Sequence, residues 1–158
     1  MNTPPAGEPP AFPGEGGQTP EQRVVIEDLI ATIRDESLPP AKKSGLVRRH
    51  SISMMKGLLE NPTAQNIKEA KKGIAEVVKL VLADDETLHY LLDITSHDFY
   101  TYTHSVGVGV LGIALAKALF KGTSNHDMSA LGTGFFLHDV GKVSIDPSII
   151  TKPEIGRA

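Results

Sequence analysis

Residues 67–82 read IKEAKKGIAEVVKLVL, and this stretch indicates the fold class. Its apolar side chains recur every three or four residues, at Ile67, Ala70, Ile74, Val77, Val78, Val81 and Leu82. That spacing puts them on one face of an α-helix and leaves the charged residues on the other. We therefore predict an amphipathic helix that packs its apolar face against other helices.

The segments on either side also favour helices. Thr19 and Pro20 are typical of a helix start, and Pro39-Pro40 and Asn61-Pro62 are typical stops. Expected helices run from Pro20 towards Pro39, over about 41–59, through the apolar face of 67–82, and over about 101–121 and 125–138. Asp84-Asp85 can cap a further short helix that carries Leu88, Leu91 and Leu92. No segment alternates apolar and polar residues over a strand length. The predicted class is all-α, a helical bundle.

The chain divides into three parts by composition. Residues 1–20 contain six prolines and four glycines, which predicts a disordered tail. Residues 21–95 are expected to form an N-terminal helical region, and residues 96–158 a second helical part.

Composition narrows the function classes. The 158 residues carry 16 Lys and Arg against 19 Asp and Glu, a net charge of −3, which argues against a nucleic-acid partner. Cysteine is absent, so any metal must be held by His, Asp or Glu. The longest apolar stretch, 106–116, is shorter than the roughly 20 residues of a spanning helix. Without a secretory signal either, we expect a cytoplasmic protein with no membrane span.

Three glycines, Gly107, Gly109 and Gly112, interrupt the apolar helix expected over 101–121. A helical glycine is about 1 kcal/mol less favourable than alanine, so such a run usually has a packing reason. We expect another helix to cross this one closely.

The dipeptide His-Asp occurs three times, at 97–98, 126–127 and 138–139. The first two lie at expected helix starts, where capping is the simpler role. His138-Asp139 instead follows an apolar run, where an ionised carboxylate needs a compensating charge. A divalent metal would supply that charge, and so would a pair between Asp139 and Lys142 that closes the helix. His50 and His89 are expected to be ordinary, partly exposed residues.

A second histidine, His104, favours the metal interpretation. Seventeen residues separate it from Lys121, and eleven separate Asp127 from His138. In an antiparallel helix pair these lengths bring the two histidines towards one end, with a shortfall of about 9 Å. Helix crossing would have to close that gap.

The motif Tyr100-x-x-x-His104-Ser105, followed by His138-Asp139-Val140-Gly141-Lys142 and Lys152-Pro153, resembles the HD-superfamily metal phosphohydrolases. More narrowly, residues 96–153 are similar to the HD-GYP branch, which hydrolyses the bacterial second messenger cyclic di-GMP in signal transduction. The Asp146-Pro147 order departs slightly from the usual Ile-Pro.

This resemblance implies the roles of four residues. His104, His138 and Asp139 match the family's metal ligands, with Asp139 bridging two divalent ions, iron or manganese. The ions would activate water for in-line attack on the phosphodiester, with Asp139 in the catalytic centre. Lys142 matches the lysine that contacts the substrate phosphate, and the ligand would be cyclic di-GMP or a related nucleotide.

The larger departure from the family is length. The chain continues for only 19 residues after Asp139, whereas the family's remaining histidines, its last metal-binding Asp and its Gly-Tyr-Pro loop lie further on. We therefore expect a truncated, incomplete HD-type domain that is inactive alone. Apolar faces meant for further helices should be exposed and favour homo-oligomers.

Two other functions stay open. Residues 20–95 could serve as a non-catalytic helical module that binds a protein partner. Alternatively, the chain is similar to a generic HD hydrolase of nucleotides or phosphate esters, because the segment that distinguishes the branches is absent.

Overall fold

The computed structural model describes residues 20–93, 101–121 and 125–150 of the chain. The described part is helical and contains no strand, which confirms the predicted all-α bundle. The elements are α1 (Pro20–Arg34), α2 (Pro40–Glu60), α3 (Ala64–Ala83), α4 (Asp85–Asp93), α5 (Thr101–Leu119), α6 (Met128–Leu137), the 3₁₀ helix η1 (Val140–Ser144) and α7 (Pro147–Ile150). Thr19, the dipeptide His97-Asp98, Tyr100 and the predicted tail up to residue 19 lie outside the described residues.

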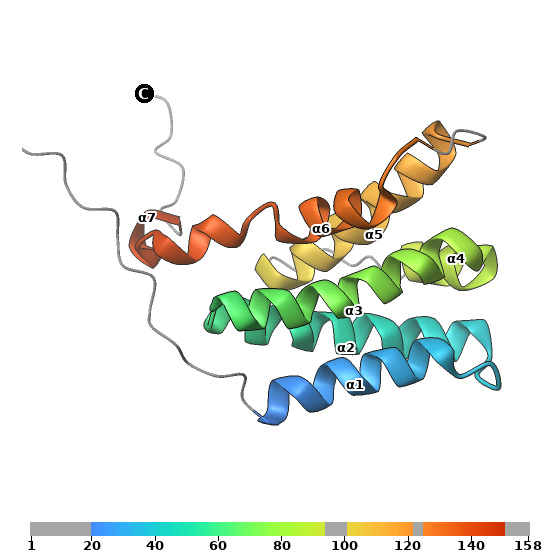
Figure 1. The fold of residues 1–158 in the computed structure, drawn as a ribbon, viewed down its shortest axis with the longest axis horizontal. Coiled ribbons are helices and arrows are strands. Elements are labelled where there is room, and N and C mark those ends of the chain that lie inside the picture. Colours follow the sequence, from blue (N-terminus) through green and yellow to red (C-terminus); the bar gives the residue numbers. More distant parts are fainter. Residues whose placement is uncertain (1–19, 94–100, 122–124, 151–158) are drawn as a thin grey trace, which may run out of the picture.

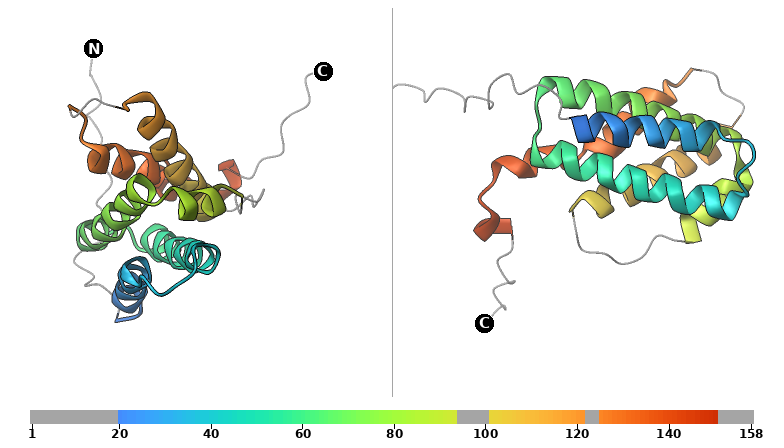
Figure 2. Two further views of the ribbon diagram at one scale, coloured as in Figure 1. Left: turned by 90° about the vertical axis from the view of Figure 1, so that its right-hand side faces the viewer. Right: turned by 90° about the horizontal axis from the view of Figure 1, so that it is seen from below.

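The helices are stacked in layers (Figures 1 and 2). α2 runs antiparallel to both α1 and α3, so α1 and α3 point the same way, and α1 packs on both α2 and α3. The end-on view in Figure 2 shows α5 and α6 on the side of α2 and α3 that faces away from α1. α2 and α3 are therefore the middle layer, and both also contact α5.

Helix α3 is central because its predicted apolar face is buried. Ala70, Ile74, Val77, Val78 and Val81 are all at most 2% exposed. Their cluster includes side chains from α1, α2, α4, α5 and α6, so one hydrophobic core runs through all three layers.

Side chains that cap the helices fix where α3, α4 and α6 begin. The Thr63 hydroxyl accepts from the Asn66 amide at the start of α3. Asp84 accepts from the Thr87 amide at 2.8 Å and caps α4, and Asp127 accepts from the Ala130 amide at 2.9 Å and caps α6. The capping roles predicted for Asp84 and Asp127 are thus confirmed, and α6 begins at Met128, three residues later than the earliest predicted start.

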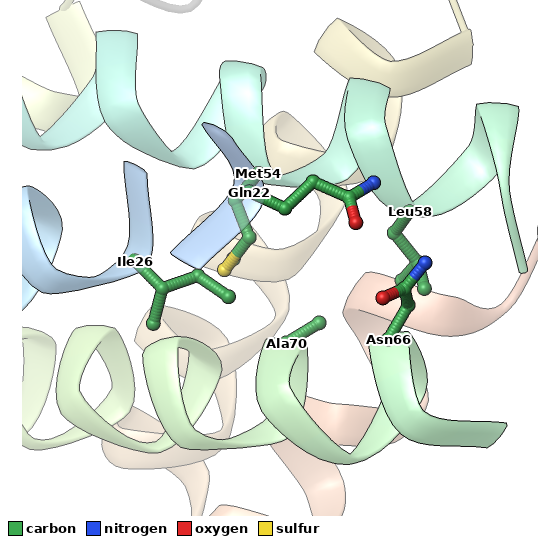
Figure 3. A pocket seen from close by; sticks show the side chains of 6 residues that line it. All are labelled: Gln22, Ile26, Met54, Leu58, Asn66 and Ala70. Atoms are coloured by element: carbon green, nitrogen blue, oxygen red, sulfur yellow. The ribbon is translucent and has the colours of Figure 1, made fainter. Parts of the chain in front are cut away.

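A small polar cluster ties the start of α1 to the α2–α3 connection (Figure 3). The Gln22 side-chain amide donates to the Gly57 carbonyl at 2.6 Å. The side-chain amide of Asn66 likewise donates to the Asn61 carbonyl at 2.7 Å. Both side chains line a cavity of about 10 Å³, whose other walls are Ile26, Met54, Leu58 and Ala70. These bonds add a second donor to two carbonyls at the end of α2 that also accept backbone N–H groups, Gly57 from Asn61 and Asn61 from Thr63.

Two of the three glycines in α5 allow the close approach of α6. A Cβ at Gly109 would overlap the ring of Phe136, and one at Gly112 would lie 2.7 Å from the ring of Phe135. A Cβ at Gly107 would meet nothing within 4 Å, so the packing role predicted for that residue is not seen. The expectation of a tight helix crossing is confirmed at the other two.

Within the described residues, α5 is one helix of 19 residues that is long and apolar enough to cross a membrane by those two criteria alone. The sequence argument against a span counted only the apolar stretch 106–116, whereas the helix, predicted over 101–121, also includes less apolar residues at either end. A core helix of a soluble protein passes the same test, and α5 packs against α2, α3 and α6.

We expect Gly109→Ala to destabilise the protein, because the added methyl group must displace the fully buried Phe136. Overpacking of this kind costs about 1–3 kcal/mol of unfolding free energy. Urea denaturation would measure it.

The matched control is Gly107→Ala, two residues away in the same helix. Its Cβ has free space, so helix propensity should raise the unfolding free energy by about 0.5–1 kcal/mol. Equal effects of the two substitutions would contradict the packing explanation.

Candidate metal centre

The helix crossing brings both predicted histidines to one end of the α5–α6 pair. His104 lies in the first turn of α5, five residues before Gly109, and His138 follows α6 two residues after Phe136. Because Gly109 packs on Phe136 and the helices are antiparallel, both histidines lie beyond that contact in the same direction (Figure 1). Their ring centroids are 5.4 Å apart, so the crossing closes the 9 Å shortfall estimated from helix lengths.

Asp139 is close to both rings. Its Oδ2 is 3.3 Å from His138 Nε2 and 3.9 Å from His104 Nε2. One potential ligand atom from each of the three residues lies within 4.8 Å of the other two. The structure therefore brings together the whole set predicted from the sequence.

The orientation of His138 is suited to metal binding. Its Nδ1 lies 2.8 Å from the Phe135 carbonyl oxygen. A carbonyl can only accept, so Nδ1 carries a proton, and it is Nε2 that is left to offer a lone pair to an ion at the site. Metal-binding histidines commonly have such a second hydrogen bond, which fixes the tautomer. Sequence reasoning missed this contact because a backbone carbonyl has no residue signature.

Lys142 also contacts the carboxylate. Its Nζ donates to Asp139 Oδ2 at 2.6 Å across the start of η1. The Asp139–Lys142 pair, which the sequence offered as the alternative to a metal, is thus present. It uses Oδ2, the same atom that lies close to both histidines. This bond is the main reason that the pKa of Asp139 is lowered from its usual value, and the nearby His138 and His104 act in the same direction against the effect of burial.

The lowered pKa of Asp139 has two consequences. The carboxylate stays ionised well below neutral pH, as a metal ligand must. Its contacts stabilise the fold above the ordinary carboxyl pKa, and that contribution is lost as the pH falls through the lower folded value.

The residues present fit a divalent ion. Two imidazoles and a carboxylate are ligands suited to zinc, manganese and iron. The side chains of His104 and His138 remain 53% and 34% exposed, which leaves a way in for an ion and for water. Three protein ligands with further positions open are typical of catalytic rather than structural metal sites.

An apolar surface lies further along α5, beginning about two helical turns from His104. Leu111, Leu115 and Leu119 are 59–69% exposed and lie on the same face of α5 as His104, at spacings of seven, four and four residues. We call these three residues the leucine face. The prediction of exposed apolar surface is confirmed here.

The other described histidines do not join the cluster. His89 lies 3.6 Å from Asp93 one turn further along α4. His126 stacks on Phe120 at 3.8 Å, while its neighbour Asp127 caps α6. Both agree with the ordinary structural roles expected for them.

Comparison with known proteins supports a distant relationship. No family model matches the chain, and no solved structure matches it significantly. A cyclic di-GMP phosphodiesterase of Pseudomonas aeruginosa is 35% identical over 80 residues. The match covers 51% of this chain and 19% of that relative, so the matched part is about a fifth of the relative's length. The chain is therefore distantly similar to a cyclic di-GMP phosphodiesterase.

Proposed function

We propose that this chain carries part of the catalytic centre of a metal-dependent phosphodiesterase of the HD-GYP type, with cyclic di-GMP as the substrate. The observation that carries the proposal is the convergence of His104, His138 and Asp139, three potential ligands from two helix ends, within 4.8 Å. The similarity to a cyclic di-GMP phosphodiesterase supports the substrate class.

Each residue has a role in this proposal. His104 and His138 donate Nε2 to a divalent ion, iron or manganese, and the Phe135 carbonyl holds His138 in the required tautomer. Asp139 supplies a charged oxygen, and its second oxygen is available to bridge to another ion. A bound ion would polarise water and the phosphate oxygens of the substrate. Lys142 adds positive charge beside the phosphate.

Metal binding should depend on these residues in particular. We expect His104→Ala and Asp139→Asn each to weaken Mn²⁺ binding at least about tenfold, because each removes one of three ligands. Loss of the free-ion EPR signal on titration with protein would measure binding.

His89→Ala is the matched control, since His89 also lies near an aspartate, but the described residues bring no third potential ligand to that pair. Its Mn²⁺ affinity should equal that of the wild type. If the wild type bound no Mn²⁺, or if His89→Ala weakened binding as much as His104→Ala, the proposed centre would be wrong.

We also propose that the 158-residue chain is inactive alone. Three ligands leave most positions around two ions to water, so ion binding should be weak and hydrolysis slow. With saturating Mn²⁺, chromatography should detect no conversion of cyclic di-GMP to the linear dinucleotide at rates above about 0.01 per second, against typical enzyme turnover of about 10 per second. Turnover at ordinary enzyme rates that Asp139→Asn abolishes would refute the inactivity and leave the metal centre standing.

Two alternatives are separable from this proposal. A generic HD hydrolase would bind other nucleotides or phosphate esters as well as cyclic di-GMP, which competition binding would reveal. A non-catalytic module that binds a protein through residues 20–95 would show no dependence on metal. The cytoplasmic location stays a prediction.

The leucine face favours association between chains, as predicted for exposed apolar surface. We expect the average mass in sedimentation velocity to rise with concentration, and Leu115→Gln to reduce that rise. Val24→Gln, at a 53% exposed valine on α1, should leave it unchanged. A monomer at all concentrations, or an equal effect of both variants, would argue against this surface.

A further inference from the structure

We propose that Lys142 and a divalent ion compete for the same oxygen of Asp139, so that ion binding releases Lys142 to bind a phosphate-type anion. The inference rests on the proposed metal centre and adds a coupling between its ion and its anion. It assigns Lys142 two alternative partners: the Asp139 carboxylate, and an anion beside the ion.

The competition follows from which atom is shared. Asp139 has two carboxylate oxygens, yet the short contacts to His104, His138 and Lys142 all involve Oδ2. An ion bound by the two imidazoles and by this oxygen would lie about 2.0–2.2 Å from Oδ2. The Lys142 ammonium lies 2.6 Å from the same atom. Two cations on one oxygen at these distances are less than about 5 Å apart and repel each other.

A neutral donor would behave differently from lysine. Hydrogen bonds to a ligating carboxylate usually strengthen metal binding, because they orient the ligand. The Lys142 ammonium would also donate a hydrogen bond, but it brings a full positive charge that opposes a divalent ion. If the Lys142 ammonium competes with the ion, its removal should raise the ion affinity. If it only orients the carboxylate, its removal should lower the ion affinity.

Lys142 is able to leave. Its side chain is 46% exposed, and it lies in the five-residue η1, whose residues from Gly141 to Ser144 are all exposed. The flexible four-carbon stem can move the ammonium away from Oδ2 without moving the backbone. At the mouth of the site, the released ammonium offers three donors to an anion.

Competition of this kind couples two ligands. The ion frees Lys142 for the anion, and the anion holds Lys142 away from Asp139. By linkage, each must raise the affinity of the other by the same factor. A Lys142 that stays on Asp139 would give no such coupling.

The test is a Mn²⁺ titration followed by EPR, with and without inorganic phosphate, on the wild type and Lys142→Met. Methionine keeps the length of the side chain and removes its charge. We expect Lys142→Met to bind Mn²⁺ about twofold to tenfold more tightly without phosphate, as expected for loss of a partly exposed ion pair and a repulsion. Phosphate should tighten Mn²⁺ binding to the wild type and have little effect on the variant.

Lys79→Met is the matched control, because Lys79 also pairs with a carboxylate three residues away, at 2.6 Å to Glu76. It should behave as the wild type in both titrations. Equal or weaker Mn²⁺ binding by Lys142→Met would overturn the competition and leave the metal centre intact. If none of these proteins bound Mn²⁺, the proposed centre would fail, and this inference with it.

Discussion

The close contact of α5 with α6 is the constraint on which the candidate site depends. Gly109 and Gly112 give α5 a surface without side chains, and Phe136 and Phe135 of α6 pack into it. Because Phe136 is fully buried, the contact allows little sliding of one helix along the other. A shift by one helical turn would move His104 about 5 Å from His138 and separate the ligand set.

The electrostatics of the site follow from the same arrangement. Asp139 directly follows His138, so the turn after α6 brings a carboxylate against both imidazoles, and η1 then brings back Lys142. The hydrogen bond from Lys142 and the positive surroundings lower the pKa of Asp139 and keep it charged. In the sequence, the Asp139–Lys142 ion pair and the metal-ligand set are competing interpretations. In the structure, both involve Asp139 Oδ2. An ion and Lys142 therefore have the same target, which makes the charge of Lys142 part of the energetics of ion binding.

Much of the fold could be predicted from residue patterns. Helices were identified by the three- and four-residue spacing in α3 and by the capping residues Asp84 and Asp127. One close crossing was identified by the glycines of α5. Local patterns failed where packing decides. Gly107 has the same sequence signal as Gly109 but faces free space, and the start of α6 depended on which of several polar residues became the cap.

The sequence by itself determined the all-α class and the residues able to hold a metal, because helix periodicity and side-chain chemistry are local properties. Helix lengths alone left His104 and His138 about 9 Å short of meeting. Only the tertiary structure decided that their rings lie 5.4 Å apart, that the Phe135 carbonyl fixes His138, and that Lys142 and both histidines face one oxygen of Asp139. The approach of His104 depends on the crossing and register of two helices, which are set by packing between residues distant in the chain. The contacts of His138 with Phe135 and of Lys142 with Asp139 depend instead on the backbone path at the end of α6 and in η1.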